Sequence, residues 1–528
     1  MRNFQFPGRS TVHALNGMVA TSHPQATLAA IEVLRAGGTA ADAAVAACAL
    51  LGVIEPQSTG IGGDCFALYM PKGEGDIVSY NGSGRAPRAA EASWYLERNI
   101  TAIPTTSVHA VTVPGAVDAW ATILRDHGRF GLDRLLQPAI NAAENGYVVA
   151  PRIAFDWRNN VEKLRKGVNA PRYLLRNNEP PVAGDVIRQP ELAQTLRIIA
   201  KEGPDGFYKG AVAEDMVETL RGIGGLQTLE DFAAHSTETT VPIGTTYKGY
   251  DVWQCPPNGP GLTMLVMLNV LSHFDLTKYA PLSVERLHLE AEAARVAYMM
   301  REMHIADPQH VDIDVARILA KEFAAEFAAK IRMDRMLDLP NVSPRPNPST
   351  IYCTVVDKDR NACSFINSIA HPFGSAIVSN KTGVLMQNRG VGFRVQLDHP
   401  NCIAPGKRPL HTIIPCMVTK DRRAAMSFGV MGGQYQPVGQ SHVLSNMLDF
   451  GMDVQEAIDL PRALHYDGIY QLEEGIPEST AEGLRAIGHE VTRVKVPWGG
   501  GQAIWIDWER GALIGGSDPR KDGCALGY

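Results

Sequence analysis

Thr350 stands at the start of a β pattern and directly after the proline-spaced stretch PRPNPST, in which Pro344, Pro346 and Pro348 alternate with other residues. Proline keeps the chain extended and prevents helix formation, so the bond between Ser349 and Thr350 is expected in an open loop that leads into a sheet. A cut there would give Thr350 a free α-amine beside its own hydroxyl. Such an amine is a general base already in place for a weak hydroxyl nucleophile. A simple domain linker is the alternative interpretation of this stretch.

Two neighbouring side chains compete with Thr350 as nucleophile. Ser349 precedes it, and Cys353 follows three residues later in TIYCTVV. Side chains of a strand alternate between its two faces, so Cys353 should point away from the face that carries Thr350. A second chemical feature is the Gly432–Gly433 pair in GVMGGQ. Glycine backbone can approach a ligand closely, and paired N–H groups can stabilise an oxyanion, although most Gly-Gly pairs are only turns.

The composition is that of an ordinary globular protein and offers no support for a nucleic-acid partner. The 528 residues are 45% hydrophobic and 20% charged, and the net charge is −6. Eight cysteines form no CxxC pair, which favours reduced thiols over a disulfide framework. The N-terminus has no secretory h-region, and the most apolar run, LTMLVMLNVL, is too short to span a bilayer. We therefore expect a cytoplasmic protein with no membrane partner.

The N-terminal part of the chain is expected to be largely helical. Residues 21–38 and 39–52 have the signals of two successive helices, the second opened by a capping box at Thr39 and buried all round. Residues 65–70 and 76–81 predict paired strands. Residues 115–340 are predicted to be mainly helical, with loops at 151–190 and 235–260 and a long amphipathic helix at 282–304.

After residue 350 the pattern changes to β. TIYCTVV and ACSFINSI, separated by DKDRN, predict an antiparallel hairpin, and AIVS, GVLMQN, TIIPCMVT, AAMSFGVM, QAIWIDW and ALIGG predict further strands. Helices are expected around 437–450 and 453–460. Helices and strands that are grouped rather than alternating predict a layered α+β fold and argue against a parallel βαβ fold.

The whole chain resembles the γ-glutamyltranspeptidase family of N-terminal nucleophile (Ntn) hydrolases. The resemblance runs from MVATSHPQATLAAIEVLRAGGTAADAAVAACALLGVIEPQSTGIGGDCFALY through VTVPGAVDAW, TIYCTVVDKDRN, GKRPLHTIIP and GVMGGQ to GGSDPRKDGCALGY. It implies a four-layer αββα sandwich and an inactive precursor that cuts itself. The large subunit would be residues 1–349 and the small subunit residues 350–528, together forming one Ntn-hydrolase domain and an α/β heterodimer, with pairing into a heterotetramer left open.

The resemblance also assigns catalytic residues. The family's nucleophile lies seven residues before the Asp of T-x-x-x-[ST]-V-V-D, and Asp357 therefore identifies Thr350, with Thr354 as the hydroxyl of the fifth motif position. Ser368 occupies the position of a hydroxyl that contacts the nucleophile's amine. Gly432 and Gly433 match the oxyanion hole. No cofactor or metal is implied.

The segments that bind the γ-glutamyl group in the family are altered here. In NGSGRAP, Ser83 stands for the family's carboxylate-binding Arg, and Arg85 lies two residues on. In QNRGVGF, Arg389 replaces an amide and Gly392 replaces an Asp that binds the α-ammonium. An Arg there would repel an ammonium and pair with a carboxylate, unless a protein carboxylate already occupies it. His411 and Thr412, which replace a Ser-Ser, complete the expected carboxylate site.

These departures predict an amide substrate that carries a carboxylate and no α-amino group. Among relatives with an altered pocket, NRGVGF, APGKRPLHTIIP and SDPRKDGCALGY most resemble oxamate amidohydrolases, which implies hydrolysis of oxamate to oxalate and ammonia through an acyl-enzyme on Thr350. γ-Glutamyl transfer or glutathione hydrolysis, glutaryl-cephalosporin-type acylase activity and an uncut binding scaffold stay open as alternatives. GIGGD is interpreted as a turn. His288, Glu292 and His304 are interpreted as a solvated or packed helix face rather than a metal site.

Overall fold

The computed structural model describes residue 5, residues 8–340 and residues 350–528. Ser349 and the proline-spaced stretch before it lie outside the described residues.

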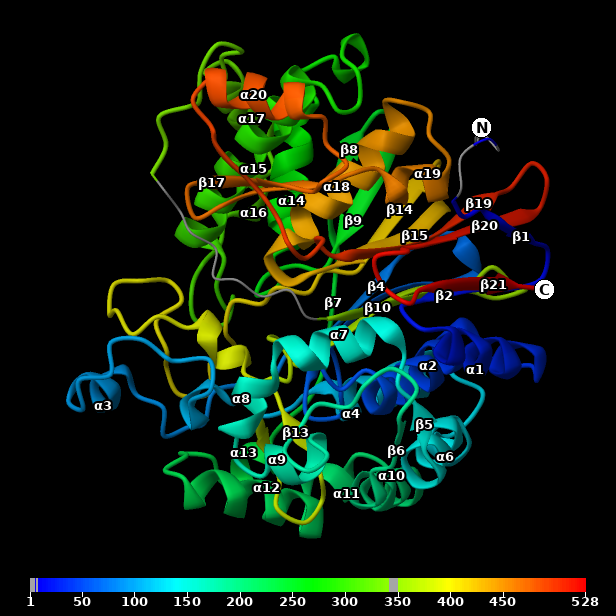
Figure 1. The fold of residues 1–528 in the computed structure, drawn as a ribbon, viewed down its shortest axis with the longest axis vertical. Helices are drawn as coiled ribbons and strands as arrows, with labels where there is room; N and C mark the ends of the chain where they lie inside the picture. The colour runs from blue at the N-terminus through cyan, green and yellow to red at the C-terminus, as the bar shows by residue number, and fades with distance from the viewer. Residues whose placement is uncertain (1–4, 6–7, 341–349) are drawn as a thin grey trace.

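Two seven-stranded sheets are stacked at the centre of the molecule (Figure 1). In spatial order, the first sheet contains β1 (Val12–Ala14), β20 (Ala512–Ser517), β19 (Gly500–Asp507), β15 (Arg423–Met431), β14 (Cys416–Lys420), β9 (Tyr250–Gln254) and β8 (Ile243–Tyr247). The second contains β21 (Cys524–Gly527), β2 (Met18–Thr21), β10 (Ile351–Val356), β11 (Ala362–Ser368), β3 (Asp64–Met70), β4 (Val78–Gly82) and β7 (Glu238–Thr240). Neighbouring strands run antiparallel throughout both sheets.

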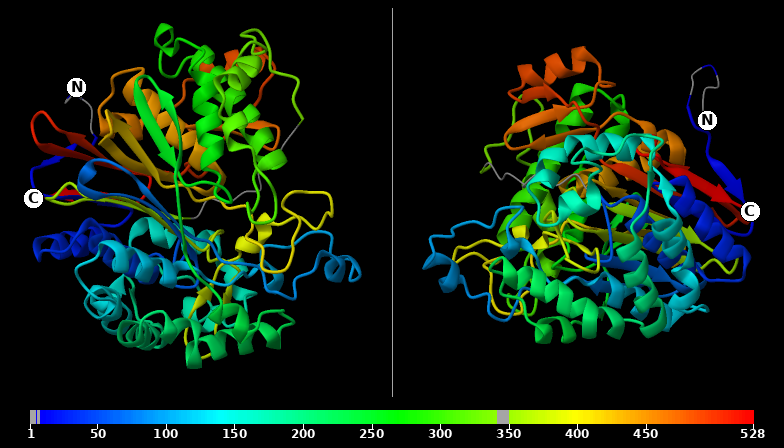
Figure 2. Two further views of the ribbon diagram at one scale, coloured as in Figure 1. Left: turned by 180° about the vertical axis from the view of Figure 1, so that it is seen from behind. Right: turned by 60° about the horizontal axis from the view of Figure 1, so that its bottom comes forward.

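Helices cover the outer face of each sheet, as the two further views also show (Figure 2). Over the first sheet lie α14 (Gly261–Leu271), α15 (Val284–His304), α16 (Val315–Ile318), α17 (Lys321–Ala328), α18 (Gln436–Leu448), α19 (Val454–Asp459) and α20 (Glu478–Ala486). On the side of the second sheet lie α1 (Pro24–Arg35), α2 (Ala40–Ile54), α4 (Ala116–His127), α5 (Leu132–Leu135), α6 (Gln137–Asn145), α7 (Pro151–Asn159), α8 (Val161–Arg165), α9 (Ala170–Leu174), α10 (Pro190–Glu202), α11 (Asp205–Tyr208), α12 (Gly210–Gly222) and α13 (Leu229–Ala233). The predicted four-layer αββα arrangement is confirmed.

Smaller elements surround this core: α3 (Ala92–Leu96) and the short strands β5 (Tyr147–Val148), β6 (Val186–Ile187), β12 (Ile377–Val378), β13 (Leu385–Met386), β16 (Ala463–Tyr466), β17 (Ile469–Leu472) and β18 (Glu490–Arg493).

Both sheets combine strands from before and after the 349/350 position. Strand β10 lies between β2 and β11, β11 pairs with β3, and β14 pairs with β9. Apolar side chains from both parts, among them Met18, Phe66, Tyr352 and Met417, fill the layer between the sheets. The two parts of the chain therefore share one hydrophobic core and do not form two separate domains.

The predicted local structure is confirmed where sequence signals are strongest. Thr39 and Asp42 form the expected capping box at the start of α2, and the helix is buried all round. The hairpin pairs Ile351 with Asn367 and Val356 with Ala362. These signals are local, so they do not depend on the rest of the fold.

Three local predictions are wrong. Residues 235–260 were expected as a loop but contain β7, β8 and β9, and residues 151–190 contain α7, α8 and α9. Helix α15 is not amphipathic, because Arg286, His288 and Glu292 are buried together with its apolar residues. It is packed on several sides, and ion pairs such as Arg286–Glu290 (2.7 Å) make that burial possible.

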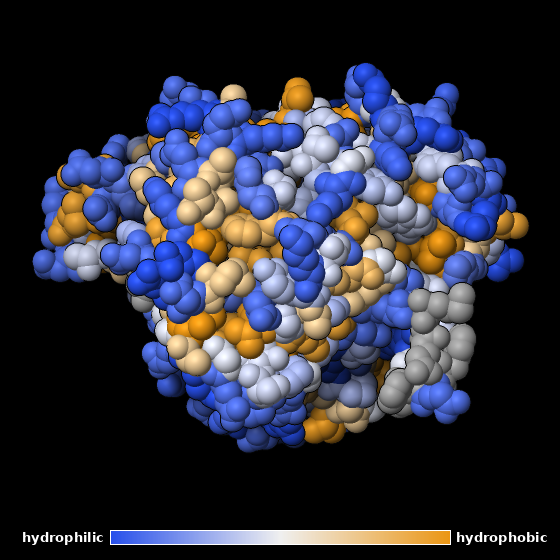
Figure 3. Space-filling model, turned by 90° about the horizontal axis from the view of Figure 1, so that it is seen from above, coloured by the Kyte–Doolittle hydropathy of each residue, from blue (hydrophilic) through white to orange (hydrophobic). Residues whose placement is uncertain are grey.

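Hydrophilic side chains predominate on the face that carries α17 and α20, with smaller apolar areas between them (Figure 3). Within the described part of the chain, no helix is long and apolar enough to cross a membrane.

Candidate active site

Thr350 and Ser368 meet at one end of the β10–β11 hairpin. Thr350 directly precedes β10 and is 1% exposed, and Ser368 is the last residue of β11. The antiparallel register brings the two ends together, and the Thr350 hydroxyl donates a hydrogen bond of 3.1 Å to Ser368 Oγ. Two residues that are 18 positions apart in the sequence thus share one buried site.

Arg389 extends this site on the side of Ser368. Its guanidinium donates to Ser368 Oγ (3.0 Å) and to Thr412 Oγ1 (2.7 Å), and the residue is 2% exposed. Burial lowers the pKa of Arg389 to about 10, while the charge of Asp64 raises it, so Arg389 is charged at neutral pH. Among the described residues no carboxylate lies within 4.0 Å of it, and its Nε has no hydrogen-bond partner. A buried cation with only hydroxyl partners is costly unless an anion joins it.

Asp64 anchors the surrounding backbone and was missed as a site residue from the sequence. Its Oδ1 accepts hydrogen bonds from the N–H groups of Gly84 (3.0 Å) and Gly115 (3.1 Å) and from the Gln387 amide (2.8 Å). Its Oδ2 lies 3.0 Å from His411 Nε2. The sequence signal that could have identified Asp64 is the GIGGD segment, which was interpreted as a turn. This segment also packs tightly against the site, because a Cβ on Gly63 would lie 2.4 Å from the Ser368 carbonyl oxygen.

The Asp64–His411 pair is held with Asp64 charged and His411 neutral. Burial and then the charge of Arg389 lower the pKa of His411 to about 4. Burial raises the pKa of Asp64, but the hydrogen bond from His411 and the charge of Arg389 outweigh this effect, and the pKa is lowered. At neutral pH the neutral ring therefore donates its Nε2 proton to Asp64. Among the described residues, Asp64 is the carboxylate whose charge acts on Arg389, and it does so without direct contact.

Gly432 and Gly433 form the turn between β15 and α18. Their φ values are 127° and 57°, which are accessible to glycine and rare for other residues. Strand β15 lies face to face with β10, since Thr354 bonds Ser427 Oγ (2.7 Å) and a Cβ on Gly429 would touch Tyr352. Continuing in this register, toward the start of β10 and toward the end of β15, brings Thr350 opposite the end of β15, where the glycine pair begins.

Replacing Gly432 with alanine should damage this turn. The added Cβ would lie 2.8 Å from Gly499 Cα in a backbone conformation that alanine rarely adopts. Because a displaced oxyanion donor costs about 100–1000-fold in kcat, we expect a loss of that order together with a lower Tm. Gly451→Ala, at a positive φ with open space around it, is the matched control and should lower Tm only. Unchanged kcat in Gly432→Ala would contradict an oxyanion role.

Three predicted site residues lie in other networks. Thr354 is four residues along β10 from Thr350, roughly 13 Å away, and donates its hydroxyl proton to Ser427. Ser83 Oγ accepts a hydrogen bond from the Asn258 amide (3.0 Å). Arg85 is paired with Glu238 (2.9 Å) and Asp307 (3.6 Å).

A cavity of about 30 Å³ lies against Arg389, with room for a group of the size of a carboxylate. Its lining includes His371, Arg389, Gly392, Thr412 and Gln434. Two further arginines line it, Arg301 and Arg394, and both pair with Glu302 at 2.6 and 2.5 Å. Three guanidinium groups thus line the cavity, two of them share the carboxylate of Glu302, and the cavity has a positive electrostatic potential.

The described residues contain one group whose atoms could hold a metal ion, His288, Glu292 and His489, with ligand atoms within 4.8 Å of one another. These atoms already make hydrogen bonds within the protein. Glu292 accepts from Arg295 (2.8 Å) and the Leu337 N–H (2.8 Å), and His288 bonds His489 and the Arg332 carbonyl at 2.8 Å each. The predicted packing of His288 and Glu292 fits these contacts, whereas His304 is only partly buried at the end of α15.

Comparisons with known proteins agree with the resemblance. The Gamma-glutamyltranspeptidase family model matches residues 26–528. The chain is 37% identical to the Glutathione hydrolase-like YwrD proenzyme of Bacillus subtilis, over 97% of this chain and 98% of that protein. It is 34% identical to the Oxamate amidohydrolase proenzyme of Klebsiella pneumoniae, over the same shares. The crystal structure of cephalosporin acylase from Bacillus halodurans superimposes with a TM-score of 0.92 at 36% identity, over 100% of this chain and 99% of that one. The chain belongs to the gamma-glutamyltranspeptidase family of Ntn hydrolases, enzymes that act on amide bonds.

Proposed function

We propose that the chain is a proenzyme that cuts itself between Ser349 and Thr350 and then hydrolyses a small amide whose acyl group carries a carboxylate. In self-cleavage, Thr350 Oγ attacks the Ser349 carbonyl carbon, the peptide C–N bond breaks, and water hydrolyses the resulting ester. The pieces, 1–349 and 350–528, stay together as a heterodimer because both sheets are built from both pieces.

In the mature enzyme the α-amine of Thr350 takes the hydroxyl proton as Oγ attacks the substrate amide. The N–H groups of Gly432 and Gly433 stabilise the tetrahedral oxyanion. The proton passes to the leaving nitrogen, the amine departs, and water releases the acyl group from Thr350. Ser368 supports the nucleophile, since its Oγ already lies within hydrogen-bond distance of both Thr350 and Arg389.

The buried charge of Arg389, which no carboxylate of the described residues contacts, is the observation that supports this substrate class best. A single hydroxyl group, that of Ser368, lies between its guanidinium and Thr350. The carboxylate that Arg389 binds must therefore lie close to the scissile amide. Oxamate, whose carboxylate is attached directly to the amide carbonyl, satisfies this condition and lacks an α-amine. The 34% identical oxamate amidohydrolase proenzyme supports oxamate as the first candidate. Thr412 would complete the carboxylate site, with His411 holding its position through Asp64.

Glutathione hydrolysis is the second candidate, because the 37% identical relative is described as glutathione hydrolase-like. A γ-glutamyl group would bring an α-ammonium to a cavity lined by Arg301, Arg389 and Arg394. That ammonium would be repelled, so we rank this candidate below oxamate.

Turnover of two substrates separates the candidates. Purified, cleaved protein should release ammonia from oxamate, with kcat/KM at least about 100-fold above that for γ-glutamyl-p-nitroanilide, since a like charge at the site costs several kcal/mol. A preference for γ-glutamyl-p-nitroanilide would contradict the role given to Arg389.

A further inference from the structure

The cavity against Arg389 contains a carboxylate of the protein itself. Glu302 lines this cavity together with Arg301, Arg389 and Arg394. Its Oε1 accepts a hydrogen bond from Arg301 Nη2 (2.6 Å), and its Oε2 accepts one from Arg394 Nη2 (2.5 Å). Each carboxylate oxygen thus binds a different guanidinium group, and Glu302 bridges the two arginines.

Burial and charge hold Glu302 in this bridge. Its side chain is 14% exposed, and that of Arg301 is 2% exposed. Burial raises the pKa of Glu302, but the charges of Arg301 and Arg394 and their hydrogen bonds outweigh this effect, and the pKa is lowered. Glu302 is therefore ionised at neutral pH and compensates both arginines. Arg389, which no carboxylate of the described residues contacts, is the guanidinium that is left for a substrate.

The other titratable groups that act on this cavity leave that charge balance unchanged. The charges of Arg394 and Glu302 both act on His399, but burial and then Arg394 lower its pKa, so its ring is neutral at neutral pH. Asp64 acts on Arg389 without touching it. Three positive charges therefore face two negative charges, and only Glu302 among those two lies in the lining of the cavity.

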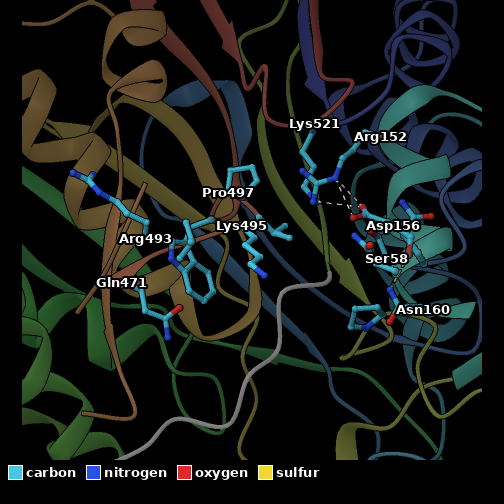
Figure 4. Close-up of a pocket in the computed structure, with 15 residues that line it drawn as sticks. Ser58, Arg152, Asp156, Asn160, Gln471, Arg493, Lys495, Pro497 and Lys521 are labelled. Atoms are coloured by element: carbon cyan, nitrogen blue, oxygen red, sulfur yellow. Dashed lines mark hydrogen bonds and ion pairs between the residues drawn. The ribbon is translucent and has the colours of Figure 1, made fainter. Parts of the chain in front are cut away.

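The wide cleft between α7 and the segment 493–498 has a different charge pattern (Figure 4). Its volume is about 490 Å³, and three carboxylates, those of Glu55, Asp156 and Asp518, act on its buried cation Lys521. No single carboxylate sets the charge of that cleft. Among the described residues that line the cavity against Arg389, by contrast, Glu302 is the one carboxylate.

The bridge formed by Glu302 marks a position at which a carboxylate is bound by two guanidinium groups. Such charge-assisted pairs are the strong ones. A substrate carboxylate at this position would meet a like charge and no free guanidinium group, because Glu302 already occupies both arginines. The cavity of about 30 Å³ has room for one further carboxylate, the one on Arg389. A second substrate carboxylate site would therefore require the removal of Glu302.

We propose that Glu302 determines the acyl specificity of this enzyme: it fills the position of a distal carboxylate and restricts turnover to short acyl groups whose carboxylate binds Arg389. This inference rests on the proposed function. Removing the Glu302 side chain should open a second site, between Arg301 and Arg394, for mono-amides of longer dicarboxylic acids. The reaction stays the same: Thr350 Oγ bonds the acyl carbon, the C–N bond breaks, the proton of Thr350 goes to the leaving ammonia, and water hydrolyses the ester.

Arg301 has contacts that hold it in place without Glu302. Its guanidinium also donates to the side-chain oxygen of Gln434 and lies 4.8 Å from the centre of the Tyr298 ring. Tyr298 in turn donates to the Gln434 carbonyl. Arg301 should therefore keep facing the vacated position when Glu302 is replaced.

Four mono-amides that differ by one methylene each test this specificity: oxamate, malonamate, succinamate and glutaramate. We expect kcat/KM of the cleaved wild type to fall with each added methylene. In Glu302→Ala, the ratio of kcat/KM for glutaramate to kcat/KM for oxamate should rise at least about 100-fold, because attraction to two arginines replaces repulsion by a like charge. Adding Arg394→Met to Glu302→Ala should remove at least about tenfold of this gain.

Glu292→Ala is the matched control. Glu292 lies on the same helix, α15, and pairs with Arg295 (2.8 Å) outside the lining of the cavity. This variant should lower Tm and leave the ratio unchanged.

Glu302→Gln keeps the shape of the side chain and provides a second variant if Glu302→Ala does not fold. It should raise the ratio about tenfold, because an amide nitrogen cannot accept a hydrogen bond from the second guanidinium group. An unchanged ratio in a folded Glu302 variant, or a gain that Arg394→Met leaves intact, would overturn the role of Glu302.

Turnover of none of the four mono-amides would instead count against the proposed acyl group. The binding of glutarate then decides on Glu302 without catalysis. Calorimetric titration should show that Glu302→Ala binds glutarate at least about tenfold more tightly than the wild type, and that Arg394→Met reverses the gain. Equal affinity of the two proteins for glutarate would overturn the inference.

Discussion

Thr350→Ala should remain a single chain of 528 residues under denaturing conditions, whereas the wild type should give two pieces of 349 and 179 residues. Alanine has no hydroxyl to attack the Ser349 carbonyl, so neither the cut nor the free α-amine can form. Amide turnover should fall at least about 10⁴-fold, as expected when a nucleophile is removed from a set of groups that act as a unit. Intact mass and ammonia release measure the two effects.

Thr354→Val is the matched control for this experiment. Thr354 lies on β10, which Thr350 directly precedes, and faces the same layer, but its hydroxyl bonds Ser427. We expect this variant to split normally, with some loss of stability from the broken buried hydrogen bond, about 1–3 kcal/mol. Thr350→Ser should split more slowly but at the same position. An uncut wild-type chain would remove the amine on which the mechanism depends and would favour a binding scaffold.

Arg389→Met should abolish most activity without destabilising the protein. Removing one partner of a buried charged pair costs about 2–5 kcal/mol, so kcat/KM for oxamate should fall about 100–1000-fold. The free energy of unfolding should stay constant or rise, because the variant no longer buries a cation that only hydroxyl groups and the distant Asp64 compensate. Activity per cleaved molecule and Tm, measured on the same preparation, separate a binding role from a structural one.

Arg85→Lys serves as the comparison, since Arg85 comes from the other altered segment and is paired with Glu238 and Asp307. We expect kcat/KM for oxamate to stay within about threefold of wild type, because a lysine keeps the charge of a part-exposed ion pair. A parallel loss of Tm and activity in Arg389→Met, or a loss of activity in Arg85→Lys equal to that in Arg389→Met, would contradict the assignment of the carboxylate to Arg389.

The sequence made Thr350 and the glycine pair candidates for the site, and it predicted the secondary structure that has strong local signals. A capping box, a polar loop between two β runs and a proline-spaced approach to a threonine are short-range features, and their physical causes act within a few residues. The order of motifs along the chain is that of the family. It was sufficient to predict the stacked sheets, because a shared order of motifs implies the same pairing of strands as in the family.

Only the tertiary structure decided which charges are free to bind a substrate. From the sequence, Arg389 was the main candidate for the substrate carboxylate and Arg85 an additional one. Arg85 is neutralised by Glu238 and Asp307, which are 153 and 222 positions away, and Arg389 has no such partner among the described residues. The Asp64–His411 pair spans 347 positions, and Lys521 meets Asp156 over a similar distance. Electrostatic energy depends on separation in space and on burial, and neither quantity can be read from a local pattern.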